Sequence, residues 1–360
     1  MAKSARPPAN GFVRVMRRVY KPIGFSKGYN AILWFLAVGY IFAFTLARLE
    51  YLSFSTIFCG VDRTPGSGAA PGECYYWLQD PFKIGMKIHL FTILPASLLV
   101  CFQFVPAIRY TFALFHRVNG HVVIVLSFVS SAGALMIAQH AFGGDLATQA
   151  YIGMLIILTT IGYIMAYINI KLLQIDQHRA WMMRTWSWFA TIITIRLIQL
   201  LSALIISKRN GFWTTWPCVQ IDSVLGRTDT ISAYPSCNAY YDGTDPMKRV
   251  IVAPEFGGNA VEIGASLAIS FGIAGWIALV LHTIAIELYL RLTPAESDRL
   301  RQISFERQLA AGYKQAGFAG LVAERFGDAA PFAPALRGRD NAMEVADIGG
   351  ECPDIMDEET

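Results

Sequence analysis

Ionisable side chains within or beside long apolar stretches are the first candidates for chemistry in this chain. All six histidines occur in such places, at positions His89, His116, His121, His140, His178 and His282. Acids occur there too, at positions Glu50, Asp145, Asp176 and Glu262. Because an ionisable group costs free energy at membrane depth, each of these residues is a functional candidate.

Acid catalysis is the chemistry that these residue types suggest. A carboxyl group in a dry, apolar site keeps its proton at neutral pH and can donate it, and a neighbouring histidine can orient or accept a proton. The candidate catalytic residues are Asp145 with His140, Asp176 with His178, and also His89, Glu50 and Arg196. For each histidine or acid the alternative is a structural role, as a hydrogen bond to a neighbouring helix, an ion pair or a solvated carboxylate.

Arg196 is the sharpest of these candidates because it lies deep inside an apolar stretch. It is about eleven residues, or roughly 16 Å of helix, from the start of that stretch. A guanidinium at that depth needs an acid, backbone carbonyls or a polar cavity as its partner. Asp145, Glu50 and Glu262 are the expected partners, and a purely structural ion pair is the alternative.

Six apolar stretches are long enough to place these residues in a membrane. The chain has 360 residues, of which 54% are apolar and 16% are charged, whereas a soluble domain carries about 25% charged residues. A spanning helix needs roughly 20 apolar residues. The stretches that qualify lie at about 29–49, 86–106, 120–139, 150–170, 185–206 and 261–284. The sequence therefore predicts an all-α fold, a polytopic membrane helix bundle with about six transmembrane helices.

Lysine and arginine residues set the predicted orientation, because they gather on the cytosolic side of membrane proteins. They are frequent in the N-terminal segment, in the loops after the second and fourth spans, and in the tail after the sixth span. The loop 140–149 has none. Both termini are therefore expected in the cytosol, and we expect a multi-pass protein of the endoplasmic reticulum that is surrounded by lipid.

The positions of the cysteines agree with this orientation. Cys59 and Cys74 fall in the predicted non-cytosolic loop 50–85, and Cys218 and Cys237 fall in the predicted non-cytosolic loop 207–258. Disulfides persist in oxidising compartments. We therefore predict the bonds Cys59–Cys74 and Cys218–Cys237, with free thiols as the alternative.

The segments outside the spans complete the predicted organisation. Residues 1–28 form a basic cytosolic segment, 29–290 the six-span domain with its two large loops, 291–339 a cytosolic helix and tail, and 340–360 an acidic tail that is expected to be disordered. The loop 207–258 is expected to fold over the membrane face as a cap. Thr293, Pro294 and Glu296 form a capping-box pattern, which predicts a helix over about 294–311.

Four segments carry a resemblance to a known family. They are Lys87–His89, His116–His121, Ala141–Gln149 and Asp176–Arg184. In this order they resemble a large family of fungal predicted membrane proteins of unknown function, often mislabelled as microtubule-associated, and the similarity covers roughly residues 30–290. Some members look like the membrane-bound terpene cyclases of fungal meroterpenoid pathways.

The resemblance implies cyclisation of a farnesyl chain on an aromatic or quinone-like head, started by protonation of a terminal alkene or an epoxide. The partner would be a small hydrophobic prenylated substrate, which a prenyltransferase or an epoxidase supplies. Such a reaction requires an acid, aromatic faces that stabilise a cation, and exclusion of water. We expect no metal or cofactor, because the chain has no DDxxD-type diphosphate motif, and no nucleic-acid partner, because it has no basic stripe with interleaved aromatics.

Two other functions are open on the sequence alone. A transmembrane electron carrier would bind two haem b groups, one between His89 and His140 and the other between His121 and His282. A transporter or lipid-binding protein without chemistry is the third reading. For the enzyme, the expected location of the site is the non-cytosolic face, where His89, His140, Asp145, Glu50 and Arg196 converge.

Overall fold

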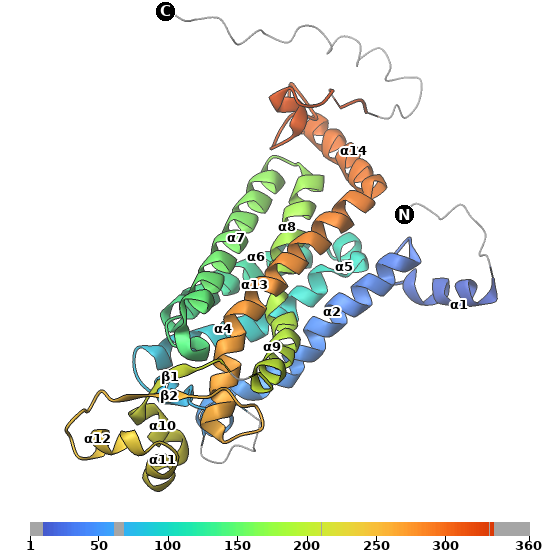
Figure 1. Cartoon of the computed structure of the whole chain (residues 1–360). Coiled ribbons are helices and arrows are strands. Elements are labelled where there is room, and N and C mark those ends of the chain that lie inside the picture. Colours follow the sequence, from blue (N-terminus) through green and yellow to red (C-terminus); the bar gives the residue numbers. More distant parts are fainter. Residues whose placement is uncertain (1–9, 61–67, 210, 331, 335–360) are drawn as a thin grey trace, which may run out of the picture. The chain divides into compact units, whose positions relative to one another are not determined.

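Long helices dominate the structure. The computed structural model describes residues 10–60, 68–209, 211–330 and 332–334 of the chain. Within this part, six helical segments are long and apolar enough to cross a membrane: Gly28–Leu52, Phe82–Gln103, Ala113–Ile137, Leu146–Lys171, Ile175–Ser207 and Ala260–Leu292 (Figure 1). The prediction of an all-α bundle with about six transmembrane helices is confirmed.

The six segments are built from seven α-helices and one short turn. These are α2 (Gly28–Arg48) with the short turn η1 (Leu49–Leu52), α4 (Phe82–Gln103), α6 (Ala113–Ile137), α7 (Leu146–Lys171), α8 (Ile175–Phe189) with α9 (Thr191–Ser207), and α13 (Ala260–Leu292). The fifth segment starts earlier than the expected range 185–206, because the polar residues 175–184 are helical and form most of α8. The sixth continues beyond position 284 to Leu292.

The chain divides into two compact units. One unit contains Met1–Ile161 and Arg184–Ile286, and the other contains Gly162–Met183 and Glu287–Thr360. The predicted acidic tail 340–360 lies outside the described residues. Each unit has its own buried polar residues, so each is described separately below.

Helices α4 and α6 of the first unit pack through small residues. A Cβ atom at Gly133 would lie 2.7 Å from the Gly85 carbonyl oxygen and 2.7 Å from the His89 backbone nitrogen. The neighbouring Ser130 fits the same narrow interface and places its Oγ 2.9 Å from His89 Nδ1. Small side chains let helix backbones approach closely in a membrane, where packing replaces the hydrophobic effect as the source of association.

Two loops of the first unit are closed by disulfides. The first loop, residues 53–81, contains η2 (Phe54–Phe58), α3 (Cys74–Trp77) and the bond Cys59–Cys74. The second loop, residues 208–259, is called the cap here and contains the bond Cys218–Cys237. Both predicted disulfides are present.

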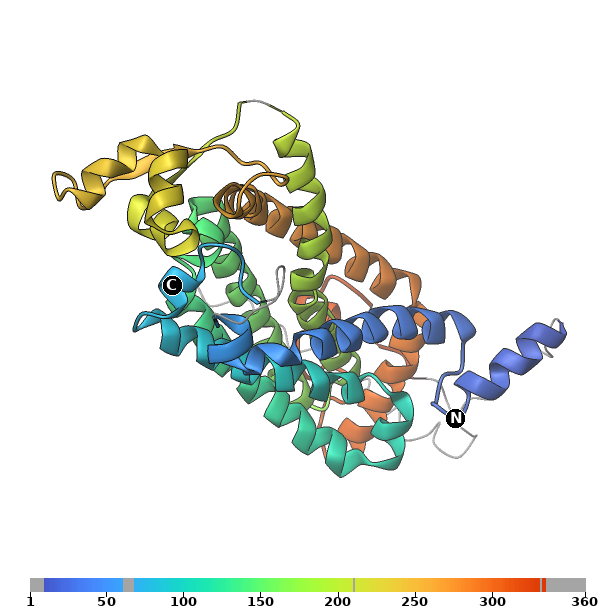
Figure 2. The same cartoon turned by 90° about the horizontal axis from the view of Figure 1, so that it is seen from below.

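The cap is a small folded element of its own. Its strands β1 (Thr214–Pro217) and β2 (Arg249–Val252) pair antiparallel, with Thr214 opposite Val252. Between them lie α10 (Cys218–Leu225), α11 (Arg227–Ala233), η4 (Pro235–Cys237) and α12 (Asn238–Tyr241). Figures 1 and 2 show these helices beyond the end of the bundle at which α13 begins. Trp216 and Val252 pack against Val261 and Ala265 of the first turns of α13, so the hairpin rests on that helix.

The second unit contains α14 (Pro294–Ala310) and the short turn η5 (Ala323–Phe326). The helix predicted over 294–311 is therefore confirmed. The two side chains of the capping-box pattern have other partners than a capping box gives them. The Thr293 hydroxyl donates to the Tyr289 carbonyl oxygen at 2.8 Å, and Glu296 pairs with Arg299 at 2.7 Å. Proline at the first helical position and the polar sequence are sufficient to start the helix.

The close approach of α4 and α6 can be tested with one methyl group. Gly133→Ala should lower the melting temperature, because overpacking of this kind costs about 1–3 kcal/mol. The matched control is Gly153→Ala in α7, where a Cβ meets no atom within 4 Å and the better helix propensity of alanine should leave the melting temperature unchanged or higher. The measurement is tryptophan-fluorescence melting of the detergent-solubilised protein. Equal melting temperatures for the two variants would contradict this packing.

Candidate functional site

Glu73 is a buried acid at the base of the first loop. Its side chain is only 9% exposed. Both carboxyl oxygens accept backbone hydrogen bonds, Oε2 from the Ala70 N–H at 3.2 Å and Oε1 from the Phe142 N–H at 2.9 Å. The next residue, Cys74, is fixed to Cys59 by the disulfide. The carboxyl group is therefore held at a defined position away from bulk water.

The cap holds the backbone of this segment from the other side. Gly72 adopts a left-handed φ of +84°, and a Cβ there would lie 2.5 Å from the ring of Trp216. Gln220 of α10 donates from Nε2 to the Gly72 carbonyl oxygen at 3.2 Å. Only glycine satisfies both this backbone conformation and this contact, so the position of Glu73 depends on the folded cap.

Phe142 connects Glu73 to the bundle. It belongs to η3 (Ala141–Gly144), the turn that joins α6 to α7, and has the left-handed values φ 47° and ψ 50°. A non-glycine residue in this region costs about 1–3 kcal/mol, and such strain is concentrated at functional sites. The conformation directs the Phe142 N–H at Glu73 and stacks the Phe142 ring on Phe271 of α13, with the ring centroids 4.2 Å apart.

Arg196 completes this group of residues from α9. Its guanidinium lies 4.9 Å from the ring centroid of Phe142 and 5.7 Å from that of Phe271. Nη1 donates to Gln199 Oε1 at 3.2 Å, and Gln199 donates in turn to the Leu267 carbonyl oxygen at 2.9 Å. The cation is therefore stabilised by two aromatic faces and one amide.

The acid that faces Arg196 is Glu73, so the expectation that Asp145, Glu50 or Glu262 would be its partner is wrong. Glu73 is the acid that attracts the guanidinium electrostatically, although among the described residues the two groups form no ion pair within 4.0 Å. Glu73 lies in a loop rather than at a span end, so the hydropathy pattern did not indicate it. The signal that could have found it is its position directly before a disulfide cysteine.

The electrostatics of Glu73 suit a proton donor. Burial raises the pKa of Glu73, and the Phe142 N–H, Arg196 and the Ala70 N–H oppose this rise without cancelling it. Burial therefore shifts this carboxyl group toward its neutral form, while groups that would stabilise the carboxylate left by proton transfer are already in place.

Aromatic side chains border the same acid. A buried cluster contains Phe54, Phe58 and Trp77, and Tyr51 and Tyr76 pack against it. Cys74 and Ala141, the direct chain neighbours of Glu73 and Phe142, pack against this cluster as well. On the side of α9, the Tyr151 hydroxyl shares a 2.8 Å hydrogen bond with Thr191 and its ring meets Phe271 edge to face.

The three acids expected at the span ends have other surroundings. Asp145 is exposed, and its Oδ1 accepts from the Thr148 N–H at 2.6 Å, so it caps the start of α7. Glu262 accepts from the Asn259 N–H at 2.7 Å in a capping arrangement at the start of α13. Glu50 is exposed. Catalytic roles for Asp145 and Glu50 stay predictions.

His89 and His140 belong to different surroundings within the first unit. His89 Nδ1 lies 3.1 Å from the Ser130 carbonyl oxygen and 2.9 Å from Ser130 Oγ, which ties α4 to α6. The His140 ring stacks on Tyr76 at 3.9 Å and meets Phe82 edge to face at 4.4 Å. Burial lowers the pKa of His140, so this ring is neutral at neutral pH and can accept a proton.

The histidine pair proposed for a second haem does not fit iron ligation. His282 uses both ring nitrogens, Nδ1 at 2.7 Å from the Ser187 carbonyl oxygen and Nε2 at 2.8 Å from Thr194 Oγ1. A haem ligand needs one ring nitrogen for the iron. His121 is exposed, with Nδ1 2.7 Å from the Arg117 carbonyl oxygen. Among the described residues no group of three His, Cys, Asp or Glu side chains is arranged to hold a metal ion.

Asp176 and His178 are held by a polar network in the second unit. Asp176 Oδ1 accepts from Gln174 at 2.9 Å and from Ser304 of α14 at 3.1 Å, and Oδ2 accepts from Gln177 at 3.2 Å. His178 Nδ1 lies 2.9 Å from the Ala166 carbonyl oxygen. These hydrogen bonds join α8 to α14, and a catalytic role for either residue stays a prediction.

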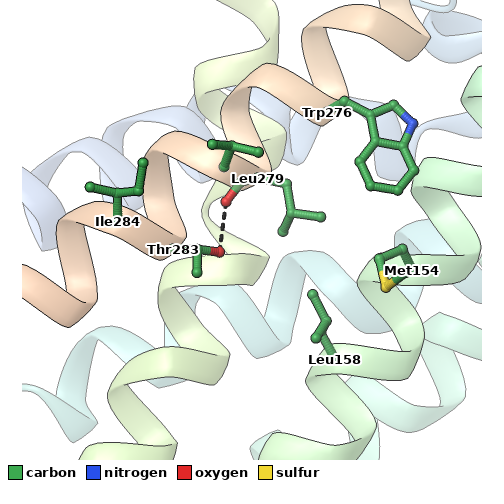
Figure 3. Close-up of a pocket in the computed structure, with 7 residues that line it drawn as sticks. Met154, Leu158, Trp276, Leu279, Thr283 and Ile284 are labelled. Atoms are coloured by element: carbon green, nitrogen blue, oxygen red, sulfur yellow. Dashed lines mark hydrogen bonds between the residues drawn. The ribbon is translucent and has the colours of Figure 1, made fainter.

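The first unit also has an apolar groove between α7 and α13. It has a volume of about 270 Å³ and is lined by Met154, Leu158, Trp276, Leu279, Val280, Thr283 and Ile284. Figure 3 shows Met154 and Leu158 on one side and Trp276 and Leu279 on the other. The Thr283 hydroxyl is bonded to the Leu279 carbonyl oxygen at 2.8 Å. With no ionisable group in its lining, the groove suits a hydrocarbon chain and no acid–base chemistry.

Comparison with known proteins agrees with a membrane protein that has a relative in fungal biosynthesis. Residues 86–217 match the family described as "Predicted membrane protein (DUF2306)". A protein of Aspergillus versicolor, "Ava biosynthesis cluster protein G", is 25% identical over 329 residues, which cover 79% of this chain and 94% of that protein. No solved structure matches the chain.

The buried Glu73 predicts a particular dependence of stability on pH. The unfolded carboxyl titrates near the ordinary value of 4.5, below its folded-state pKa. As the pH rises past 4.5 the unfolded chain loses this proton first, so the free energy of unfolding falls until the folded-state pKa is passed. Glu73→Gln should flatten this decline, whereas Glu50→Gln, at an exposed position, should leave it unchanged. Melting curves recorded across this pH range measure the effect, and an identical decline in wild type and Glu73→Gln would refute it.

Proposed function

We propose that this protein is a membrane-embedded terpene cyclase that acts on the prenyl chain of a meroterpenoid, with Glu73 as the acid that starts the reaction. The observation that carries the proposal is a buried carboxyl group with two backbone N–H donors, a nearby guanidinium and an adjoining aromatic cluster. An acid of this kind can protonate a weakly basic alkene or epoxide only where water is excluded.

The first step is transfer of the Glu73 proton to the substrate. The O–H bond of the carboxyl group breaks. The π electrons of the terminal alkene form the new C–H bond, or a lone pair of the epoxide oxygen takes the proton and the C–O bond of the epoxide then breaks. Positive charge develops on the prenyl chain, and a carboxylate is left on Glu73. The N–H groups of Ala70 and Phe142, together with Arg196, stabilise that carboxylate without needing to move.

The position of Arg196 determines where the carbocation can be stabilised. The guanidinium already covers the rings of Phe142 and Phe271 and would repel a second cation there. The aromatic cluster around Phe54 and Phe58, with Tyr51 and Tyr76 against it, is the side that remains for cation–π attraction. In this proposal the prenyl chain lies against this cluster, with its reacting end toward Glu73.

The last step is loss of a proton from the cyclised cation. His140 is a suitable acceptor because its ring is neutral and stacks on Tyr76, which packs against the same cluster. A C–H bond next to the final cation breaks, its electrons form an alkene, and His140 carries the proton to solvent. Glu73 is reprotonated from solvent, so the product is an isomer of the substrate and no cofactor is consumed.

The comparisons support a role in biosynthesis. The relative from Aspergillus versicolor carries the name of a biosynthesis cluster, and an apolar substrate suits a protein whose helices are long enough to span a bilayer. A prenyltransferase or an epoxidase would supply the substrate, and the endoplasmic reticulum is the proposed location.

Turnover of a prenylated substrate tests the proposal directly. Membranes from a host that expresses the chain are incubated with a farnesylated phenol or its terminal epoxide, and products are separated by chromatography with mass detection. Wild type should form a cyclised isomer. Glu73→Gln should reduce turnover by about 10²-fold or more, because it removes the transferable proton but keeps a similar shape.

The other acids provide matched controls in the same assay. Asp145→Asn, Asp176→Asn and Glu50→Gln should keep turnover within a few-fold of wild type, whereas His140→Ala should slow the final step. If Glu73→Gln reacts like wild type, Glu73 is not the acid, and loss of turnover in Asp145→Asn or Asp176→Asn would identify the correct one. A Soret absorption band in purified protein that lacks cyclase activity would instead support the electron carrier.

A further inference from the structure

The first helix, α1 (Gly11–Tyr20), separates apolar and basic residues onto two faces. Phe12, Val15, Met16 and Val19 follow helical spacing along one face, and Arg14, Arg17, Arg18 and Lys21 follow the same spacing along the opposite face. This segment lies within the region 1–28 that the sequence predicts to be basic. In the folded helix, this basic face lies opposite a continuous apolar face.

The apolar face of α1 is not covered by the described protein. Phe12 is 71% exposed, Val15 is 53% exposed and Val19 is 58% exposed. No residue of the helix is buried. The helix nevertheless has a defined start, because Asn10 Oδ1 accepts from the Val13 N–H at 2.9 Å and caps it.

The segment after α1 is fixed where two membrane helices end. The Ile23 carbonyl oxygen accepts from the Ala107 N–H at 2.9 Å, and Ala107 belongs to α5 (Pro106–Thr111), directly after α4. Phe25 packs on Trp34 of α2 with the ring centroids 5.4 Å apart. Gly24, with φ +99°, permits this approach, because a Cβ there would lie 2.7 Å from the Ala107 nitrogen. The exit of α1 is therefore held beside the end of α4 and the start of α2.

We infer that α1 lies in the plane of the membrane surface and binds anionic phospholipid, with its apolar face in the acyl chains and its arginines on the headgroups. A helix with opposed apolar and basic faces binds this boundary by burying the first and pairing the second with negative lipid. Each basic residue near such a surface strengthens binding by about fivefold. The inference concerns a different part of the chain from the proposed catalytic site and does not depend on it.

Two labelled variants of the full-length protein test the orientation of the helix. A fluorophore that reports polarity is attached at Val15→Cys on the apolar face or at Arg14→Cys on the basic face, in a background with Cys352→Ser. The remaining free thiol, Cys101, is buried, and the background protein alone gives the labelling control. The protein is placed in lipid nanodiscs that contain lipids spin-labelled near the headgroup.

The expected result is a blue-shifted and strongly quenched signal at position 15, with a water-like and weakly quenched signal at position 14. Equal signals at the two positions would overturn the inference. A water-like signal at both would mean that the face is free in the nanodisc, as a protein-docking surface would be.

The lipid preference is measured with the Val15→Cys label in phosphatidylcholine nanodiscs with and without phosphatidylserine. Phosphatidylserine should increase the quenching, and high salt should reduce this increase. Arg14→Gln with Arg18→Gln should weaken the preference by about 25-fold, and an unchanged melting curve shows that the bundle is intact. A preference that is the same in this double variant would also overturn the inference.

Discussion

The hydrogen bond from the Phe142 N–H to Glu73 Oε1 joins two parts of the chain that are far apart in sequence, and much of the candidate site depends on it. It requires the left-handed backbone of Phe142, which also places the Phe142 ring against both Phe271 and Arg196. On the other side it requires the first loop to be closed by Cys59–Cys74 and held by the cap through Gly72. A buried acid therefore links the first loop, the cap and the bundle.

The same arrangement resolves an apparent conflict in the site. A guanidinium near a carboxyl group favours the carboxylate, whereas proton donation needs the neutral acid. Burial is the larger effect at Glu73 and raises its pKa, and the distance to Arg196 exceeds that of an ion pair. The cation is stabilised instead by Phe142, Phe271 and Gln199. Arg196 thus contributes when negative charge develops on Glu73, the moment at which stabilisation accelerates a reaction.

The sequence was sufficient for features with a local or periodic origin. Hydropathy located the six spans, and the placement of Cys59, Cys74, Cys218 and Cys237 in two loops gave both disulfides. The sequence was insufficient where burial arises from contacts between residues that are far apart in the chain. Asp145 looked like a candidate acid beside His140, yet its local surroundings make it a helix cap. Glu73, in contrast, is buried next to Gly72, which Gln220 contacts from a distant part of the chain. No local pattern encodes that second contact.

The proposed reaction requires that Glu73 holds its proton to a higher pH than an ordinary carboxyl group, as its burial favours. Infrared spectroscopy tests it directly, because a protonated carboxyl group has a carbonyl band that is separate from the bands of carboxylates. The difference spectrum between wild type and Glu73→Gln in lipid at neutral pH should contain this acid band, and it should persist when the pH is raised moderately. A difference spectrum with only carboxylate bands at neutral pH would show that Glu73 is ionised and would contradict the account.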